Sequence, residues 1–124
     1  MSYSKMRETP FKQKVEKWLE DNGYWFIKYW AGARYTKEGI PDILACINGT
    51  FYGMELKGDD GIPTLLQLKN LRDIRKADGI GVLLYPDDFK SFVELTRGME
   101  SGQSWYSQNI DKQLKLFNKL KNIY

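Results

Sequence analysis

Residues 39–57 of this 124-residue chain read GIPDILACINGTFYGMELK. Two apolar runs flank Asn48-Gly49, and an Asn-Gly pair in this setting is the strongest short-range signal for a β-hairpin with a two-residue type I′ turn. In such a hairpin, residues whose numbers add up to 97 face each other across the two strands. The predicted register therefore places Asp42 directly opposite Glu55.

This register brings two carboxylates together on one face of one sheet. Like charges in directly opposed positions destabilise a sheet, and a divalent cation is the simplest partner that would offset the cost. Because side chains alternate between the two faces of a strand, Lys57 shares the face of Glu55. The hairpin thus predicts an acid, acid, base cluster. The alternative is that Asp42 caps a turn while Glu55 and Lys57 form an ordinary surface ion pair.

The chain contains no histidine. This absence excludes Ser-His-Asp triads, Cys-His pairs, HNH nuclease sites and His-ligated zinc. Hydrolytic chemistry must then rely on carboxylates, lysine and a hard cation, Mg²⁺ or Mn²⁺. A single cysteine, Cys46, excludes an internal disulfide and fits a reducing cytoplasm. No apolar run approaches the roughly 18 residues of a membrane span, so we expect no membrane association.

Helical and strand patterns alternate along the first 97 residues. Thr9-Pro10 predicts a helix start with Thr9 as the N-cap, and Thr64 predicts a second one. The resulting order predicts an α/β fold with a mixed central β-sheet of about four strands flanked by helices. The expected elements are a helix over 9–22, strands over 24–30, 40–47 and 50–56, a helix over 64–77, a strand over 80–85 and a helix over 89–97.

The remaining residues divide into two parts. Residues 98–107 have the composition of a linker, and 108–124 show the apolar period of a basic amphipathic helix. Four lysines and one aspartate lie between 103 and 124, so the net positive charge of the chain is concentrated there. This helix could pack on its own domain, pair with a second copy of the chain, or lie on DNA.

Several of these features occur together in one known family. The segments 39–42 (GIPD) and 55–57 (ELK), followed by Gln67 on a helix and by an apolar strand after Gly79, resemble the PD-(D/E)XK nucleases, and in particular their small VRR-NUC type. The resemblance covers about residues 11–97. It implies a restriction-endonuclease-like core within residues 1–97.

The resemblance also implies a role for each matching residue. Asp42 and Glu55 would hold one or two Mg²⁺ or Mn²⁺ ions, with the backbone carbonyl of Leu56 as a further oxygen ligand and no organic cofactor. Lys57 would position the attacking water or neutralise developing charge. Gln67 would orient a phosphate or that water.

The first helix departs from the family pattern. The family carries a further acidic ligand on this helix, and the position that aligns with it here is Lys12. Glu8 and Glu16 lie one helical turn away on either side. We favour Glu16 as the possible extra ligand, because it lies securely within the helix, although a solvated surface glutamate is the simpler alternative.

Two segments supply candidate DNA contacts. The loop before the hairpin offers Arg34 and Lys37 for backbone phosphates and Tyr35 for stacking on a base. Lys69 and Arg72 belong to a basic face of the helix over 64–77. Solvent-exposed surfaces with no ligand are the alternative in both places.

The resemblance implies a metal-dependent DNA endonuclease. Small phage members of the family act as symmetric pairs on Holliday junctions, so we expect a homodimer that cuts branched DNA in the cytoplasm of a bacterial or phage-infected cell. A flap or single-strand nuclease of the same fold is the nearest competitor. A non-catalytic dimeric DNA-binding protein, which Lys12 favours, and an RNA-processing enzyme also remain open.

Overall fold

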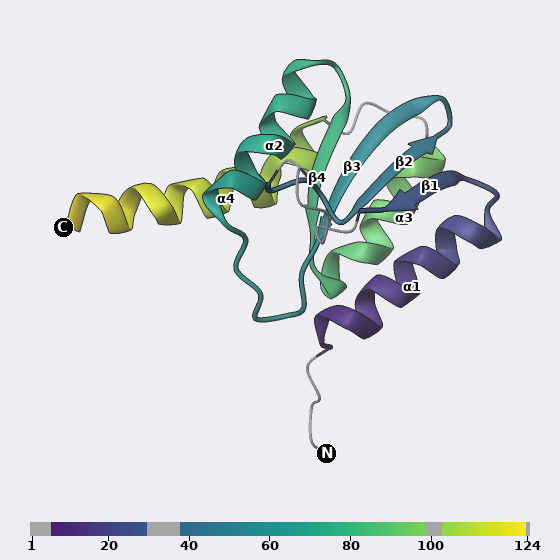
Figure 1. The fold of residues 1–124 in the computed structure, drawn as a ribbon, viewed down its shortest axis with the longest axis horizontal. Coiled ribbons are helices and arrows are strands. Elements are labelled where there is room, and N and C mark those ends of the chain that lie inside the picture. Colours follow the sequence, from purple (N-terminus) through teal and green to yellow (C-terminus); the bar gives the residue numbers. More distant parts are fainter. Residues whose placement is uncertain (1–5, 30–37, 99–102, 124) are drawn as a thin grey trace.

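The computed structural model of the chain describes residues 6–29, 38–98 and 103–123. Its elements alternate as an α/β fold requires, which confirms the predicted class (Figure 1). In chain order they are α1 (Glu8–Asp21), β1 (Trp25–Lys28), β2 (Ile43–Ile47), β3 (Thr50–Leu56), α2 (Leu65–Lys76), β4 (Ile80–Leu84), the 3-10 turn η1 (Pro86–Asp88), α3 (Phe89–Gly98) and α4 (Gln103–Ile123).

The four strands form one mixed sheet in the order β1-β2-β3-β4. β1 and β2 pair antiparallel, as do β2 and β3, whereas β4 runs parallel to β3. Helix α2 connects β3 to β4. Asn48 and Gly49 have φ angles of 52° and 82°, as a type I′ turn requires. The pairs from Ile47↔Thr50 to Ile43↔Met54 confirm the predicted register. Asp42, however, lies one residue before β2 begins, so it faces Glu55 from just beyond the ladder.

One face of the sheet, which we call the first face, packs against α1 and α3. Its side chains come from alternate positions of each strand, because successive residues point to opposite sides. Phe11, Val15 and Leu19 of α1 and Phe92 of α3 are fully buried against it. The strand residues of this face are Ile43, Ala45, Ile47, Tyr52, Met54, Leu56, Ile80, Val82 and Leu84.

The opposite side, the second face, carries Leu44, Phe51, Gly53 and Glu55 on β2 and β3. Its β4 half is covered by a smaller core in which Leu83 packs with residues of α2 and α4. Gly53 lies against Pro41 and Ile74, so a side chain at this position would displace one of them. This close approach fixes Pro41, and with it the neighbouring Asp42, over the second face.

The ends of the first two elements differ from the prediction. α1 begins at Glu8 with Arg7 as the N-cap, so Pro10 is the third helical residue and Thr9 is not the cap. Proline is tolerated there because the first four N–H groups of a helix have no intrahelical acceptor. β1 is confined to Trp25–Lys28, shorter than the predicted strand over 24–30.

Two further features depart from the sequence pattern. Leu65 lies at the helical spacing of the buried Leu68 and Leu71 of α2 but is 54% exposed. The polar Asn70 is buried instead and donates to the carbonyls of Glu38 and Leu66. The C-terminal helix starts at Gln103 rather than 108, and Tyr106, in the predicted linker, is buried against the first face. Burial of this aromatic side chain explains why a segment with linker composition is helical.

The ends of α4 differ in their surroundings. Its first turns pack on the sheet and beside α2, while its last part projects away from the body (Figure 1). Within residues 6–29, 38–98 and 103–123, no helix is long and apolar enough to cross a membrane.

Candidate active site

The acidic pair lies where β3 ends. Oδ2 of Asp42 accepts a hydrogen bond of 2.9 Å from the main-chain N–H of Leu56, which ties the segment before β2 to the end of β3. Tyr29 reinforces this position, since its N–H donates to the Asp42 carbonyl at 2.8 Å. The N–H of Leu56 therefore lies beside Asp42, and the role of its carbonyl as a metal ligand stays a prediction.

Glu55 is the most deeply buried acid of this site, with only 1% of its surface exposed. Burial raises its pKa to about 9, and the hydrogen bond and charge of the adjacent Asp42 raise it too, against the opposing effect of Lys57 and Lys12. Oε1 of Glu55 is buried with no hydrogen-bond partner among the described residues. This atom needs either a proton or a cation.

Lys57 stands beside Glu55 as predicted. Its ammonium is 3.7 Å from Oε2 of Glu55 and 3.8 Å from Oε1 of Glu8, and its side chain is 15% exposed. A lysine ammonium has three donors, so one that lies between two carboxylates retains a donor for a further anion.

Gln67 also reaches the site, through an arrangement that sequence reasoning missed. Its Nε2 donates to Oε2 of Glu55 at 3.3 Å, while its Oε1 accepts from the N–H of Thr64 at 2.8 Å. Thr64 Oγ1 in turn accepts from the Gln67 N–H, which completes a capping box at the start of α2. The T-x-x-Q spacing was the available signal. Gln67 therefore orients Glu55, and its contact with a phosphate or the attacking water stays a prediction.

Lys12 of α1 lies at the acidic pair, bound between two carboxylates. Its ammonium lies 3.2 Å from Oδ1 of Asp42 and 3.1 Å from Oε2 of Glu8. Burial lowers the pKa of Lys12, but the charges and hydrogen bonds of Asp42 and Glu8 outweigh this and raise it overall. Lys12 thus carries a fixed positive charge at the acidic pair.

The structure distinguishes the two glutamates proposed as an extra ligand. Glu8 pairs with both Lys12 and Lys57 and so belongs to the cluster. Glu16 instead pairs with Lys28 of β1 at 3.5 Å. The geometry favours Glu8 over our preferred Glu16.

The candidate DNA-binding residues are only partly placed. Arg34, Tyr35 and Lys37 lie outside the described residues. Lys69 is exposed and pairs with Asp73 at 2.7 Å. Arg72 is exposed and, with Arg75 and Lys76 of α2 and Asp111 of α4, lines a hollow of about 320 Å³.

The donor set fits one divalent cation. Carboxylate and carbonyl oxygens are the ligands that Mg²⁺ and Mn²⁺ prefer, and Glu55 Oε1 is a buried oxygen without a partner. Among the described residues, no group of three or more Asp, Glu, Cys or His side chains is arranged to hold a metal ion. Two carboxylates and the carbonyl of Leu56 would therefore supply the protein ligands.

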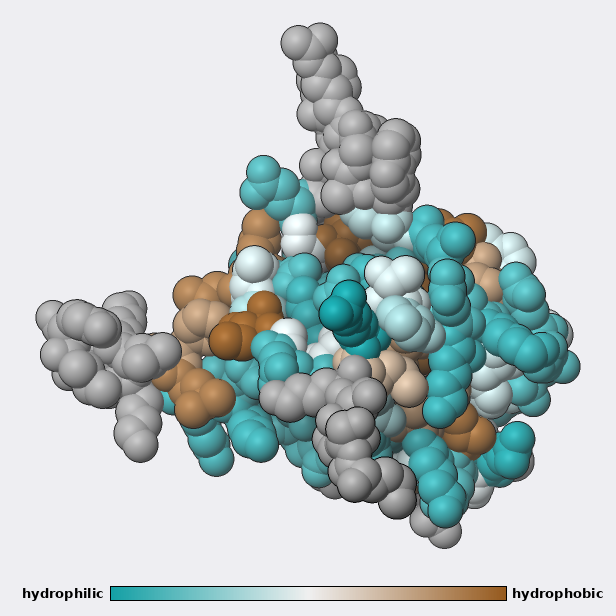
Figure 2. Space-filling view, turned by 90° about the horizontal axis from the view of Figure 1, so that it is seen from below, coloured by the Kyte–Doolittle hydropathy of each residue, from teal (hydrophilic) through white to brown (hydrophobic). Residues whose placement is uncertain are grey.

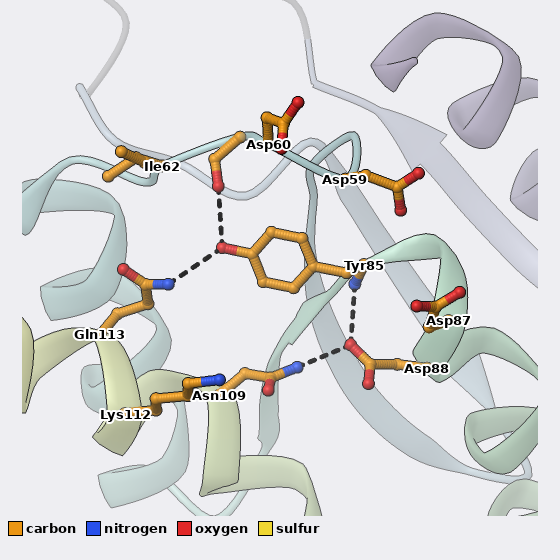
Figure 3. A pocket seen from close by; sticks show the side chains of 10 residues that line it. Asp59, Asp60, Ile62, Tyr85, Asp87, Asp88, Asn109, Lys112 and Gln113 are labelled. Atoms are coloured by element: carbon orange, nitrogen blue, oxygen red, sulfur yellow. Dashed lines mark hydrogen bonds between the residues drawn. The ribbon is translucent and has the colours of Figure 1, made fainter. Parts of the chain in front are cut away.

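A pocket of about 580 Å³ lies behind the connector that follows Lys57 (Figure 3). Tyr85, at the end of β4, donates its hydroxyl to the Gly61 carbonyl at 2.9 Å and accepts from Gln113 of α4 at 3.2 Å. Asp88 accepts from Asn109 of α4 at 2.8 Å and from the N–H of Tyr85 at 3.0 Å. These contacts anchor the connector through α4, a role that the sequence did not suggest.

The surroundings of the site are polar. Figure 2 views the molecule from the end where the connector between β3 and α2 lies, and hydrophilic side chains cover much of the described surface there. Such a surface suits a charged ligand better than an apolar one.

Comparison of the sequence with protein-family models and with curated proteins finds no match to either.

Proposed function

We propose that this protein is a metal-dependent endonuclease that hydrolyses phosphodiester bonds in DNA. The observation that carries the proposal is the buried Glu55, whose Oε1 has no partner, beside Asp42 and within reach of Lys57. Most buried side-chain oxygens in proteins have a hydrogen-bond partner, so one that has none is a candidate ligand for a cation. A buried carboxylate pair next to a lysine suits cation-assisted phosphoryl chemistry.

Each side chain of the site has a separate role in the proposed reaction. Asp42 and Glu55 would hold Mg²⁺ or Mn²⁺, which would supply a water ligand of lowered pKa and positive charge for the phosphate. Gln67 keeps Glu55 in the rotamer that presents Oε1, and the N–H of Leu56 fixes Asp42. Lys57, with its point charge and three donors, stabilises the negative charge that develops on the phosphate oxygens.

The substrate, assembly and location follow from the family resemblance. The substrate is branched DNA such as a Holliday junction, cut by a homodimer in the cytoplasm of a bacterial or phage-infected cell. The exposed cations of α2, including Lys69 and Arg72, are the described candidates for contacts with the DNA backbone.

The test is cleavage of end-labelled substrates by the wild-type protein with Mg²⁺, with Mn²⁺ and with EDTA. The panel comprises a four-way junction, a flap, a linear duplex, a single strand and a matched RNA. The proposal predicts paired symmetric cuts in the junction that require metal. Cuts confined to flaps or single strands would replace the substrate, and no metal-dependent cut in any DNA would reject the nuclease.

A second candidate function is a non-catalytic DNA-binding protein of the same fold. The observation that favours it is the Lys12 ammonium, 3.2 Å from Asp42, which already compensates part of the acidic charge. This candidate predicts junction binding that is unchanged by EDTA and no cleavage in the same panel.

A further inference from the structure

The contacts of the Lys12 ammonium limit the number of cations that the site can hold. Its ammonium contacts Oδ1 of Asp42 at 3.2 Å and Oε2 of Glu8 at 3.1 Å, and so bridges α1 to the acidic pair. Its side chain is 31% exposed, and that of Asp42 is 23% exposed. The contact is therefore partly shielded from water and less screened than an ordinary surface ion pair.

The carboxylate oxygens around this bridge are largely engaged. Oδ2 of Asp42 accepts from Leu56, Oε2 of Glu55 accepts from Gln67, and Oε1 of Glu8 faces Lys57. Glu55 Oε1 is the buried carboxylate oxygen that lacks a partner in the described part of the chain. The site thus leaves one opening for a cation at its buried end.

A second ion would meet two obstacles. Paired catalytic ions lie about 3.5–4 Å apart and share carboxylates. An ion bridging Asp42 and Glu8 would have to displace the Lys12 ammonium, which carries the same sign of charge. Glu8 is a third carboxylate nearby, but no group of three or more such side chains among the described residues is arranged to hold a metal ion.

We propose that the site binds a single divalent ion at Glu55 and Asp42, and that the ammonium of Lys12 occupies the place of a second ion. This inference rests on the proposed function, which assigns the cation to the acidic pair. Lys12 acts as a positioning residue, because it holds Asp42 and Glu8 and supplies fixed positive charge without touching the reacting atoms.

Replacement of Lys12 by an acid should then change the site from one that binds one ion to one that binds two. Lys12→Glu removes the ammonium and puts a carboxylate in its place beside Asp42 and Glu8, which supplies oxygen ligands where a second ion would lie. Lys12→Arg retains the charge and should retain one ion. Lys17→Glu is the matched control, because it makes the same charge change on the same helix. Lys17 pairs with the exposed Asp21 at 3.0 Å and lies outside the site.

The experiment is calorimetric titration of the full-length proteins with Mn²⁺, with folding checked by circular dichroism. We expect one ion per chain for the wild type, Lys12→Arg and Lys17→Glu, and two for Lys12→Glu. If Lys12→Glu does not fold, Lys12→Gln replaces it and should take up a second, weaker ion. Two ions in the wild type, or one ion in both the Glu and Gln variants, would overturn the inference while leaving the nuclease proposal intact. No Mn²⁺ binding to the wild type would overturn both.

Discussion

The two faces of β3 differ in the kind of side chain that they bury, although the residues concerned are neighbours in the chain. On the first face, Met54 and Leu56 are completely buried among apolar side chains. On the second face, Phe51 is 47% exposed and Glu55 is a buried acid that contacts Lys57 and Gln67. Burial alone stabilises the first face, whereas a buried carboxylate is tolerated only with specific partners. Stability and the proposed chemistry should therefore be separable by substitutions one residue apart.

The largest expected effect on stability comes from the first face. Met54→Ala should lower the free energy of unfolding by about 2–5 kcal/mol, because it leaves a cavity in a fully packed core. Cleavage per folded molecule should be unchanged. Urea denaturation measures the loss, and Phe51→Ala on the second face is the matched control with a smaller loss. Equal losses for the two variants would contradict the distinction between the faces.

The next effect concerns the chemistry of the second face. Lys57→Ala should reduce the single-turnover cleavage rate by about 10²–10³-fold, as removal of one charge-stabilising donor does in other enzymes. Junction affinity should change much less. Lys90→Ala, at an exposed position of α3, is the control and should cut at the wild-type rate. A Lys57→Ala enzyme of normal rate would remove Lys57 from the mechanism.

Glu55 should make stability depend on pH when no metal is present. Its pKa is about 9 in the folded protein against an ordinary 4.5, so the folded state binds the extra proton. This contribution is complete below pH 4.5 and is lost as pH rises toward 9, by up to about 1.4 kcal/mol per pH unit. Urea denaturation in EDTA across this range, compared with Glu55→Gln, isolates the effect. A difference between the two proteins that is independent of pH would contradict it.

The smallest expected change in stability comes from substitution of Tyr85, whose hydroxyl bonds the connector behind the site. Tyr85→Phe removes the hydroxyl that donates to Gly61 and accepts from Gln113, which should cost about 0.5–1.5 kcal/mol of stability. Gln113→Ala removes only the 3.2 Å bond and should cost less. Thermal denaturation of both variants ranks them, and the reverse order would show that Tyr85 does not anchor the connector through Gly61.

Local patterns predicted the fold well for identifiable reasons. The Asn48-Gly49 turn fixes the register because both residues adopt positive φ, and strand alternation then assigns each face. The sequence pattern was misleading where contacts between residues far apart in the chain determine the local structure. Tyr106 is helical because it packs against the first face, and Leu65 is exposed although its spacing matches a buried stripe.

The candidate site was predictable only where it lies within the hairpin. Asp42, Glu55 and Lys57 follow from the register, whereas the contact between Lys12 and Asp42 depends on how α1 packs across the sheet. The T-x-x-Q spacing at Thr64 signals the capping box that holds the Gln67 amide. Its contact with Glu55, however, depends on how α2 packs on the sheet.

The most direct test of the central claim compares Glu55→Gln with the wild type on one labelled four-way junction, with Mg²⁺ present. Glutamine mimics the protonated carboxyl, so it should preserve folding and junction binding but not the cation. Glu94→Gln, at an exposed position of α3, is the control. The account predicts that Glu55→Gln binds the junction with wild-type affinity and does not cut it, while the control does both. Cleavage by Glu55→Gln at the wild-type rate would contradict the account.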